Sequence, residues 1–268
     1  MLGKLLKYEL QSLIKKMWPL YVVLFCCSIG SSLICNSLIP DLAEYHEDLL
    51  LFRLFTLILY GLIIALGVVT FVQIVNRFRK SLLGREGYLL FTLPVSVNTH
   101  LISKIISVVI LGIMNSFVYI LSIVVVLFIT PELSASLAHI FSFDSLVYAI
   151  NEIAAEFGVS TGHLILTYIL LCIEWSAYFI LIIYFSLVLG HLSNKNKFLR
   201  SVLIYIGINM VVGIIFQIGL VSFVVLVQNV VNLDIMPILD TLIAIGVLLV
   251  SGLYFGTWYL LKNKLNLE

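Results

Sequence analysis

The stretch Leu101–Thr130 reads LISKIISVVILGIMNSFVYILSIVVVLFIT, and Lys104 is its only charged residue. A helix rises 1.5 Å per residue, so about 20 apolar residues cross a hydrocarbon core that is about 30 Å thick. This stretch is longer than that, and its apolar residues are continuous rather than alternating as in a β-barrel strand. It therefore predicts a transmembrane helix.

The rest of the chain repeats this pattern. Of its 268 residues, 62% are hydrophobic and 11% are charged, which is typical of a polytopic membrane protein. We therefore expect an all-α integral membrane protein with one transmembrane domain, residues 1–268, and six spans. The five spans besides Leu101–Thr130 are Trp18–Ile39, Leu49–Val75, His163–Gly190, Val202–Gln228 and Ile238–Leu261.

The charges between the spans predict their orientation. Fourteen of the 15 Lys and Arg residues lie on one side of the six-span layout: Lys4, Lys7, Lys15, Lys16, Arg77, Arg79, Lys80, Arg85, Lys104, Lys195, Lys197, Arg200, Lys262 and Lys264. The opposite connections contain only Arg53 and most of the acids: Asp41, Glu44, Glu47, Asp48, Glu132, Asp144, Glu152, Glu156 and Asp234. The positive-inside rule then places both termini in the cytoplasm and the chain in the cell membrane.

The first 17 residues have the pattern of an amphipathic helix. Apolar side chains recur at helical spacing at Leu2, Leu5, Leu6, Leu10, Leu13, Ile14 and Met17. We expect residues 1–17 to form an interfacial helix on anionic lipid, with a sharp change of direction at Pro19. A cytoplasmic extension of the first span remains the alternative. No cleavable signal peptide is expected, because a full-length span follows without a small-residue cleavage site.

The cytoplasmic connection over residues 76–100 contains an unusual apolar segment. Gly87–Pro94 reads GYLLFTLP, which is too short to span a bilayer and too apolar to remain alone in water. We expect it to dock as a helix in a hydrophobic groove of a soluble partner. Ser96 is then expected to cap the third span, and Lys104 to anchor the cytoplasmic end of that span.

At these residues the chain resembles the permease subunits of type-2 ABC exporters. Those proteins have six spans, an interfacial N-terminal helix and a coupling helix between spans two and three, and residues 87–96 here are similar to the coupling-helix pattern of tyrosine and leucines followed by Leu-Pro. The likeness covers the whole layout, whereas the motif is confined to Arg85–Lys104. It implies that a separate ATP-binding subunit docks on Gly84, Arg85, Glu86, Gly87, Tyr88, Leu89, Leu90, Phe91, Thr92, Leu93 and Pro94. Residues 191–200 would form a second, smaller contact.

The sequence contains none of the catalytic or metal-binding motifs that we considered. It contains no G-x-x-x-x-G-K-[ST] loop for phosphates and no H-E-x-x-H zinc motif, so we expect no catalytic or metal site and place ATP and Mg²⁺ in the partner subunit. The basic residues lie at span ends, where orientation and lipid contact explain them better than a nucleic-acid partner, so we expect no nucleic acid. We expect the cysteines to be packing residues: Cys26, Cys27, Cys35 and Cys172.

Four polar residues lie within the spans. A charge at membrane depth costs about 2.5 to 3.5 kcal/mol, so Glu174 is not expected to face lipid. It is a polar contact on a transport path, a proton-linked group, or a packing group bonded to Asn115, Asn209 or a serine on a neighbouring helix. Asn115, Asn209 and Gln217 are expected to satisfy one another across helices.

Pairs of small residues within the spans predict close helix contacts. They are Gly252 with Gly256 in the sixth span and Gly61 with Ala65 in the second.

The long outer connection, residues 131–162, contains a second amphipathic pattern. Leu146, Ile150 and Ile153 share one helical face, acidic residues lie opposite, and Gly158 supplies a stop. We expect a helix that caps the exit of a path, receives a cationic amphipathic substrate with its acidic face, or rests on the outer leaflet.

Together these features favour a dimeric export permease for hydrophobic or amphipathic substrates. The candidate substrate classes are peptides, lipids and drugs. Six spans per chain call for a second copy to line a path. The acidic outer side leans toward amphipathic peptides, as in exporters of the phenol-soluble modulin kind. The main alternative is a non-transporting sensor, immunity or scaffold subunit. An ion-coupled secondary transporter would show inverted repeats and several membrane-depth charges, and the sequence shows neither.

Overall fold

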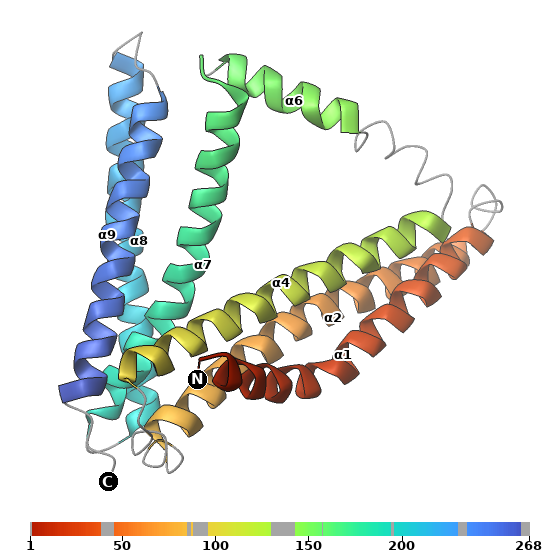
Figure 1. Ribbon diagram of the computed structural model, residues 1–268. Helices are drawn as coiled ribbons and strands as arrows, with labels where there is room; N and C mark the ends of the chain where they lie inside the picture. Colours follow the sequence, from red (N-terminus) through yellow and green to blue (C-terminus); the bar gives the residue numbers. More distant parts are fainter. Residues whose placement is uncertain are drawn as a thin grey trace. The chain divides into compact units, whose positions relative to one another are not determined.

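A computed structural model describes residues 2–38, 46–84, 87, 96–129, 143–156, 158–193, 196–229 and 235–263. This part of the chain is helical, without strands. Its helices are α1 (Leu2–Leu38), α2 (His46–Phe78), α4 (Val97–Ile129), α6 (Phe143–Glu156), α7 (Thr161–His191), α8 (Lys197–Asn229) and α9 (Ile235–Asn263), shown in Figure 1. A π-helical turn, Arg79–Leu83, continues α2.

Six of these helices are long and apolar enough to cross a membrane, which confirms the predicted set. The segments are Leu5–Leu33, Leu57–Leu83, Val97–Val126, Thr161–His191, Lys197–Gly219 and Leu239–Asn263. Large apolar side chains remain exposed along them, including Ile64 at 66% and Leu248 at 71%. A surface of this kind is costly in water and neutral in lipid.

The chain divides into two compact units. Unit 1 comprises Met1–Ile74 and Ile106–Val147, and unit 2 comprises Val75–Ile105 and Tyr148–Glu268. The dividing points fall within α2, α4 and α6, so each unit contains parts of these helices.

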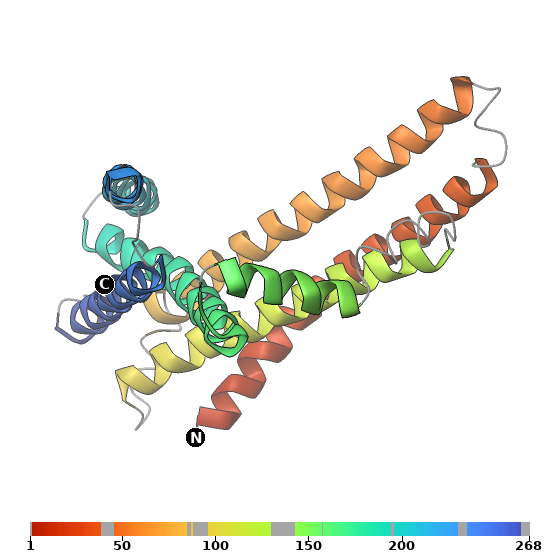
Figure 2. The same ribbon diagram turned by 90° about the horizontal axis from the view of Figure 1, so that it is seen from above.

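In unit 1, three helices share a small core, and Figures 1 and 2 show α1 beside α4. The core consists of Leu13, Met17 and Tyr21 from α1, Leu66 from α2 and Leu111 from α4. Two hydrogen bonds cross it. The Tyr21 hydroxyl donates to Asn115 Oδ1 at 2.5 Å, and Asn115 Nδ2 donates to Thr70 Oγ1 at 3.0 Å. The Asn115 amide therefore connects α1, α2 and α4.

The expected change of direction at Pro19 does not interrupt the helix. α1 continues through Pro19 as one helix, although proline cannot donate to the Lys15 carbonyl. Figure 1 shows a clear bend between the N-terminal part of this helix and the rest. Met17 and Tyr21, on either side of Pro19, pack into the same core, and this shared packing holds the helix together across the proline. The interfacial position of residues 1–17 stays a prediction.

In unit 2, α7 packs against both α8 and α9. The three helices converge at the end where α7 leads into α8, and α7 stands further from the other two toward α6 (Figure 1). Close contacts hold the converging end. The ring of Phe78, the last residue of α2, stacks on Tyr184 of α7 with centroids 4.0 Å apart. Gly256 of α9 leaves space for the ring of Phe185.

The outer amphipathic helix predicted before Gly158 is confirmed as α6. Gly158 has φ of 65°, its N–H donates to Ala155 O at 3.1 Å, and the Val159 N–H donates to Ala154 O at 3.0 Å. This is the Schellman arrangement, in which a left-handed glycine satisfies the last carbonyls of a helix. Ser160 then caps α7 by accepting from the His163 N–H at 3.3 Å. The side of the membrane on which α6 lies stays a prediction.

Candidate functional site

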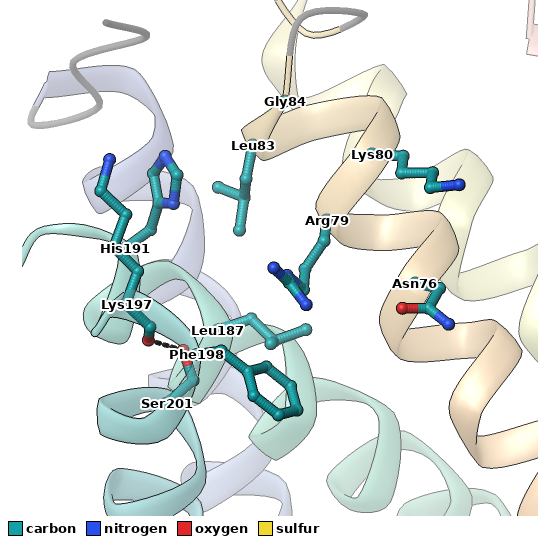
Figure 3. A pocket seen from close by; sticks show the side chains of 10 residues that line it. All are labelled: Asn76, Arg79, Lys80, Leu83, Gly84, Leu187, His191, Lys197, Phe198 and Ser201. Atoms are coloured by element: carbon teal, nitrogen blue, oxygen red, sulfur yellow. Dashed lines mark hydrogen bonds between the residues drawn. The ribbon is translucent and has the colours of Figure 1, made fainter. Parts of the chain in front are cut away.

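A cavity of about 290 Å³ lies within unit 2, where α2 ends and α7 turns into α8. We call it the inner-end cavity, because the orientation predicted from the charges would place it at the cytoplasmic side. Its lining residues, drawn in Figure 3, are Asn76, Arg79, Lys80, Leu83, Gly84, Leu187, His191, Lys197, Phe198 and Ser201.

The π-helical turn forms one wall of this cavity. Within this turn, Ser81, Leu82 and Leu83 are buried in the protein, whereas Arg79 and Lys80 are exposed. The turn ends at Gly84, where an added Cβ would lie 2.9 Å from the Lys80 carbonyl oxygen. Only glycine accommodates so close an approach of the backbone. π-Helical turns inside longer helices are frequent at functional sites.

The α7–α8 connection forms the opposite wall. An added Cβ on Gly190 would overlap the backbone nitrogen and Cα of Ser201, so glycine is what allows the first turns of α8 to pack on the end of α7. Asn196 precedes α8 with φ of 50°, a left-handed conformation that asparagine tolerates. Its carbonyl accepts from the Arg200 N–H at 3.1 Å. This turn brings Lys197 and Phe198 to the cavity.

The ionisable groups of the cavity are basic, and its other polar groups, Asn76 and Ser201, are neutral. The Arg79 guanidinium lies over the Phe198 ring, 4.9 Å from its centroid. In Figure 3 this guanidinium points toward the α7–α8 connection, whereas Lys80 points away from it. Arg79 and Lys197 both lie near enough to His191 for their charges to act on it. Within the described residues, no carboxylate pairs with Arg79, Lys197 or His191.

The predicted coupling residues are described only in part. Gly84 lines the cavity, and the Gly87 N–H donates to the Gly84 carbonyl at 2.9 Å. Arg85, Glu86 and residues 88–94 lie outside the described residues, so their docking stays a prediction. The structure does bring Gly84 together with His191 and Lys197, which come from the connection named as the second contact.

Beyond this segment, one expectation is confirmed and one is wrong. Ser96 caps α4, because its Oγ accepts from the Thr99 N–H at 3.3 Å. Lys104 does not reach the surface: its side chain is only 4% exposed. It shares the inward face of α4 with His100 and Ser103, which are 2% exposed, so the polar face of this helix end is turned into the protein.

Glu174 of α7 packs against α9. Its carboxyl group occupies the position that a Cβ on Gly246 would take. Its Oε2 atom is buried without a hydrogen-bond partner, as is the Tyr178 hydroxyl one turn further along α7. The structure therefore places two unsatisfied polar atoms in the same part of α7.

The predicted partners of Glu174 are wrong. Asn115 bonds to Tyr21 and Thr70, and Asn209 Nδ2 donates to Tyr205 O of its own helix at 2.8 Å. Gln217 is exposed. The three neutral polar residues thus do not satisfy one another across helices, because each side chain turns to a nearer acceptor or outward.

The small-residue pattern located one close contact and missed two. Gly256 does approach Phe185, but Gly252 and Gly61 have no neighbour within 4 Å of an added Cβ. Gly190 and Gly246 make the other close contacts. Only the position of a partner helix distinguishes them from the remaining glycines, and the sequence does not contain that information.

Two polar contacts connect further helices of unit 2. His163 Nε2 of α7 lies 3.6 Å from Asp240 Oδ1 of α9, and both side chains are partly exposed. The Tyr254 hydroxyl of α9 donates to Asn98 Oδ1 at the start of α4. Both contacts join residues far apart in the sequence, where no local spacing relates them.

Comparison with protein-family models, with curated proteins and with solved structures found no match.

Proposed function

We propose that this chain is the membrane-spanning permease subunit of an ATP-driven exporter, similar to the type-2 ABC class. It works as a homodimer with two separate ATP-binding subunits and moves hydrophobic or amphipathic compounds out of the cell. Both termini and the inner-end cavity face the cytoplasm. The observation that carries the proposal is the packing of residues 78–84, which lead into the coupling segment, against α7.

These residues are anchored tightly enough to transmit force. Phe78 and Leu82 are 0% exposed, and Tyr184 is 1% exposed beneath Phe78. Close-packed interiors deform little, so a push on the segment after Gly84 moves the π-helical turn and α7 together. α8 and α9 pack on α7 and follow it. Movement of an ATP-binding subunit would thus become rigid-body rocking of helices, which is how alternating access operates.

The test is co-purification of an ATPase from native cells. We compare the wild-type chain with Leu89→Asp and Phe91→Asp, which place a charge on the apolar coupling segment. Tyr8→Asp is the matched control, because Tyr8 is 68% exposed on α1, outside that segment. Wild type and Tyr8→Asp should recover ATPase activity, and the two segment variants should lose it.

Recovery of no ATPase with the wild-type chain would contradict the proposal and favour the scaffold or sensor alternative. Equal recovery with all four chains would keep an ATPase partner but place its docking elsewhere. A transport assay with the purified complex in vesicles then separates a permease from a regulatory subunit, because only a permease moves substrate when ATP is added.

A further inference from the structure

The inner-end cavity contains positive charge that no described residue neutralises. Arg79 and Lys197 supply this charge from the two walls, and within the described ranges no carboxylate pairs with either of them. Like charges brought together on packed helices repel one another, and this repulsion disfavours the observed arrangement. An anion placed among them would offset the repulsion.

The positions of these groups suit a phosphate. Figure 3 shows the Arg79 guanidinium directed from the α2 wall toward the opposite wall, where Lys197 and His191 lie. Stacking on Phe198 at 4.9 Å fixes the guanidinium plane and leaves its N–H groups free to donate. Arginine binds phosphate with two parallel hydrogen bonds, and lysine adds a point charge. In Figure 3 the Lys197 side chain ends beside the His191 ring rather than opposite Arg79, so a phosphate in the cavity would receive its hydrogen bonds from Arg79 and a nearby positive charge from Lys197.

The surroundings of the cavity favour a lipid as the source of that phosphate. The apolar segments of α7 and α8 end at His191 and begin at Lys197, so the cavity lies at the ends of two spanning helices. This is the level of lipid headgroups. Leu83 and Leu187, which are nearly buried, and Phe198, which is half exposed, supply apolar walls beside the charges. Basic pockets between helices at the cytoplasmic side bind anionic headgroups.

We propose that the inner-end cavity is a binding site for a phosphate group, with an anionic lipid headgroup as the source that fits its position. Arg79 donates to the phosphate oxygens, Lys197 supplies a nearby positive charge, and Phe198 orients Arg79. The site depends on neither an ATP-binding subunit nor transport, so it can be tested on the purified chain alone.

The test measures phosphatidylglycerol binding to the full chain in detergent by native mass spectrometry, with phosphatidylcholine as the comparison, because its choline cation balances its phosphate and leaves no net charge. Each basic residue near an anionic surface contributes about 1 kcal/mol, so Arg79→Gln with Lys197→Gln should weaken phosphatidylglycerol binding about 10- to 30-fold. Phosphatidylcholine binding should not change. Lys197→Gln alone keeps the Arg79–Phe198 stack and should give an intermediate loss with an unchanged unfolding midpoint.

The matched control removes two charges elsewhere. Arg200→Gln with Lys262→Gln changes two exposed basic residues of α8 and α9 that do not line the cavity, and phosphatidylglycerol binding should fall less than about threefold. Equal losses in the cavity and control variants would overturn the proposal, because general attraction to anionic lipid would then explain the binding. A cavity variant that binds phosphatidylglycerol like wild type would also overturn it.

A second arm identifies the source of the phosphate. Inorganic phosphate is added at rising concentration to the phosphatidylglycerol complex. If it displaces the lipid from wild type, the cavity takes phosphate from solution as well. If the lipid stays bound, the source is the membrane. Either result supports the site, provided that the cavity variant loses the binding that is measured.

Discussion

The two halves of α7 have the same kind of sequence and opposite surroundings. In the half that leads to α8, Ile182 is 1% exposed and Val188 is 0% exposed. In the half that follows α6, Leu166 is 57% exposed and Trp175 is 72% exposed. The half that leads to α8, which we call the inner half, is thus part of a packed unit. The half that follows α6, which we call the outer half, has an apolar surface that only lipid or another protein can cover. This difference locates the rigid part of the chain at the end where the proposed coupling segment begins.

The difference between the halves is a matter of packing rather than hydrophobicity. In lipid an apolar side chain gains little from moving between bilayer and protein, so helices associate through close fit and small residues. The inner half has that fit at Gly190 and beside Gly256. The outer half has Glu174 against Gly246 as its close approach. Substitutions at these contacts should therefore differ strongly in effect.

The largest effect is expected at the stack between α2 and α7. Phe78→Ala removes a ring that is 0% exposed and stacked on Tyr184. It should lower the free energy of unfolding by about 3 kcal/mol. This is near the lower end of the range for Phe→Ala in the cores of soluble proteins, because in a membrane protein the loss comes mainly from packing rather than from transfer out of water. The thermal unfolding midpoint in detergent measures this. Phe216→Ala, at a residue that is 53% exposed on α8, is the control and should leave the midpoint nearly unchanged.

An unchanged midpoint in Phe78→Ala would mean that the inner half is no better packed than the outer half. The proposed transmission of force would then lose its physical basis, since loosely held residues absorb displacement. A midpoint that falls equally in Phe216→Ala would show that α8 has a covered face at that position.

The next effect is expected where α7 meets α8. Gly190→Ala places a methyl group against the backbone of Ser201, which cannot move aside as a side chain can. Overpacking of this kind costs about 1 to 3 kcal/mol, and the unfolding midpoint should fall accordingly. Gly207→Ala makes the same change on α8 with no neighbour within 4 Å, and it should cause no loss. Equal behaviour of the two variants would contradict the close approach.

A smaller effect is expected at Glu174, and a double-mutant cycle isolates it. Gly246→Ala pushes the Glu174 carboxyl out of its position and should cost about 1 kcal/mol. The same substitution in a Glu174→Ala background should cost almost nothing, because the group that it displaces is absent. Unfolding free energies of the four chains give the coupling. Additive costs would show that the carboxyl does not pack on Gly246 in the membrane.

The sequence predicted the elements whose cause lies within a few turns of helix. Uninterrupted apolar runs predicted the six long helices, Ser96 predicted the start of α4, and Gly158 predicted the end of α6. Each of these signals acts on its own neighbours, so it can be recognised without knowing where other helices lie.

The sequence did not predict what lies between helices. Asn115 was expected to pair with Asn209 or Gln217, but it bonds to Tyr21 and Thr70. Lys104 was expected at the surface and is buried. The inner-end cavity was missed because its walls, around Arg79 and Lys197, are more than 100 positions apart in the chain. Such contacts depend on which faces of helices meet, and apolar runs without polar faces do not encode that choice locally.

The smallest effect is expected in the outer half of α7, and it tests what covers this half. Trp175→Leu replaces one apolar side chain by another at a residue that is 72% exposed. If lipid or detergent surrounds this residue, the free energy of unfolding should change by less than about 0.5 kcal/mol. Ile182→Ala in the buried half should cost about 2 kcal/mol or more for comparison. A marked loss in Trp175→Leu, together with a shift from dimer to monomer in size-exclusion chromatography, would place this face at an interface between two copies. The exposed half of α7 would then be covered by protein in the working assembly, and the contrast between the halves would belong to the single chain alone.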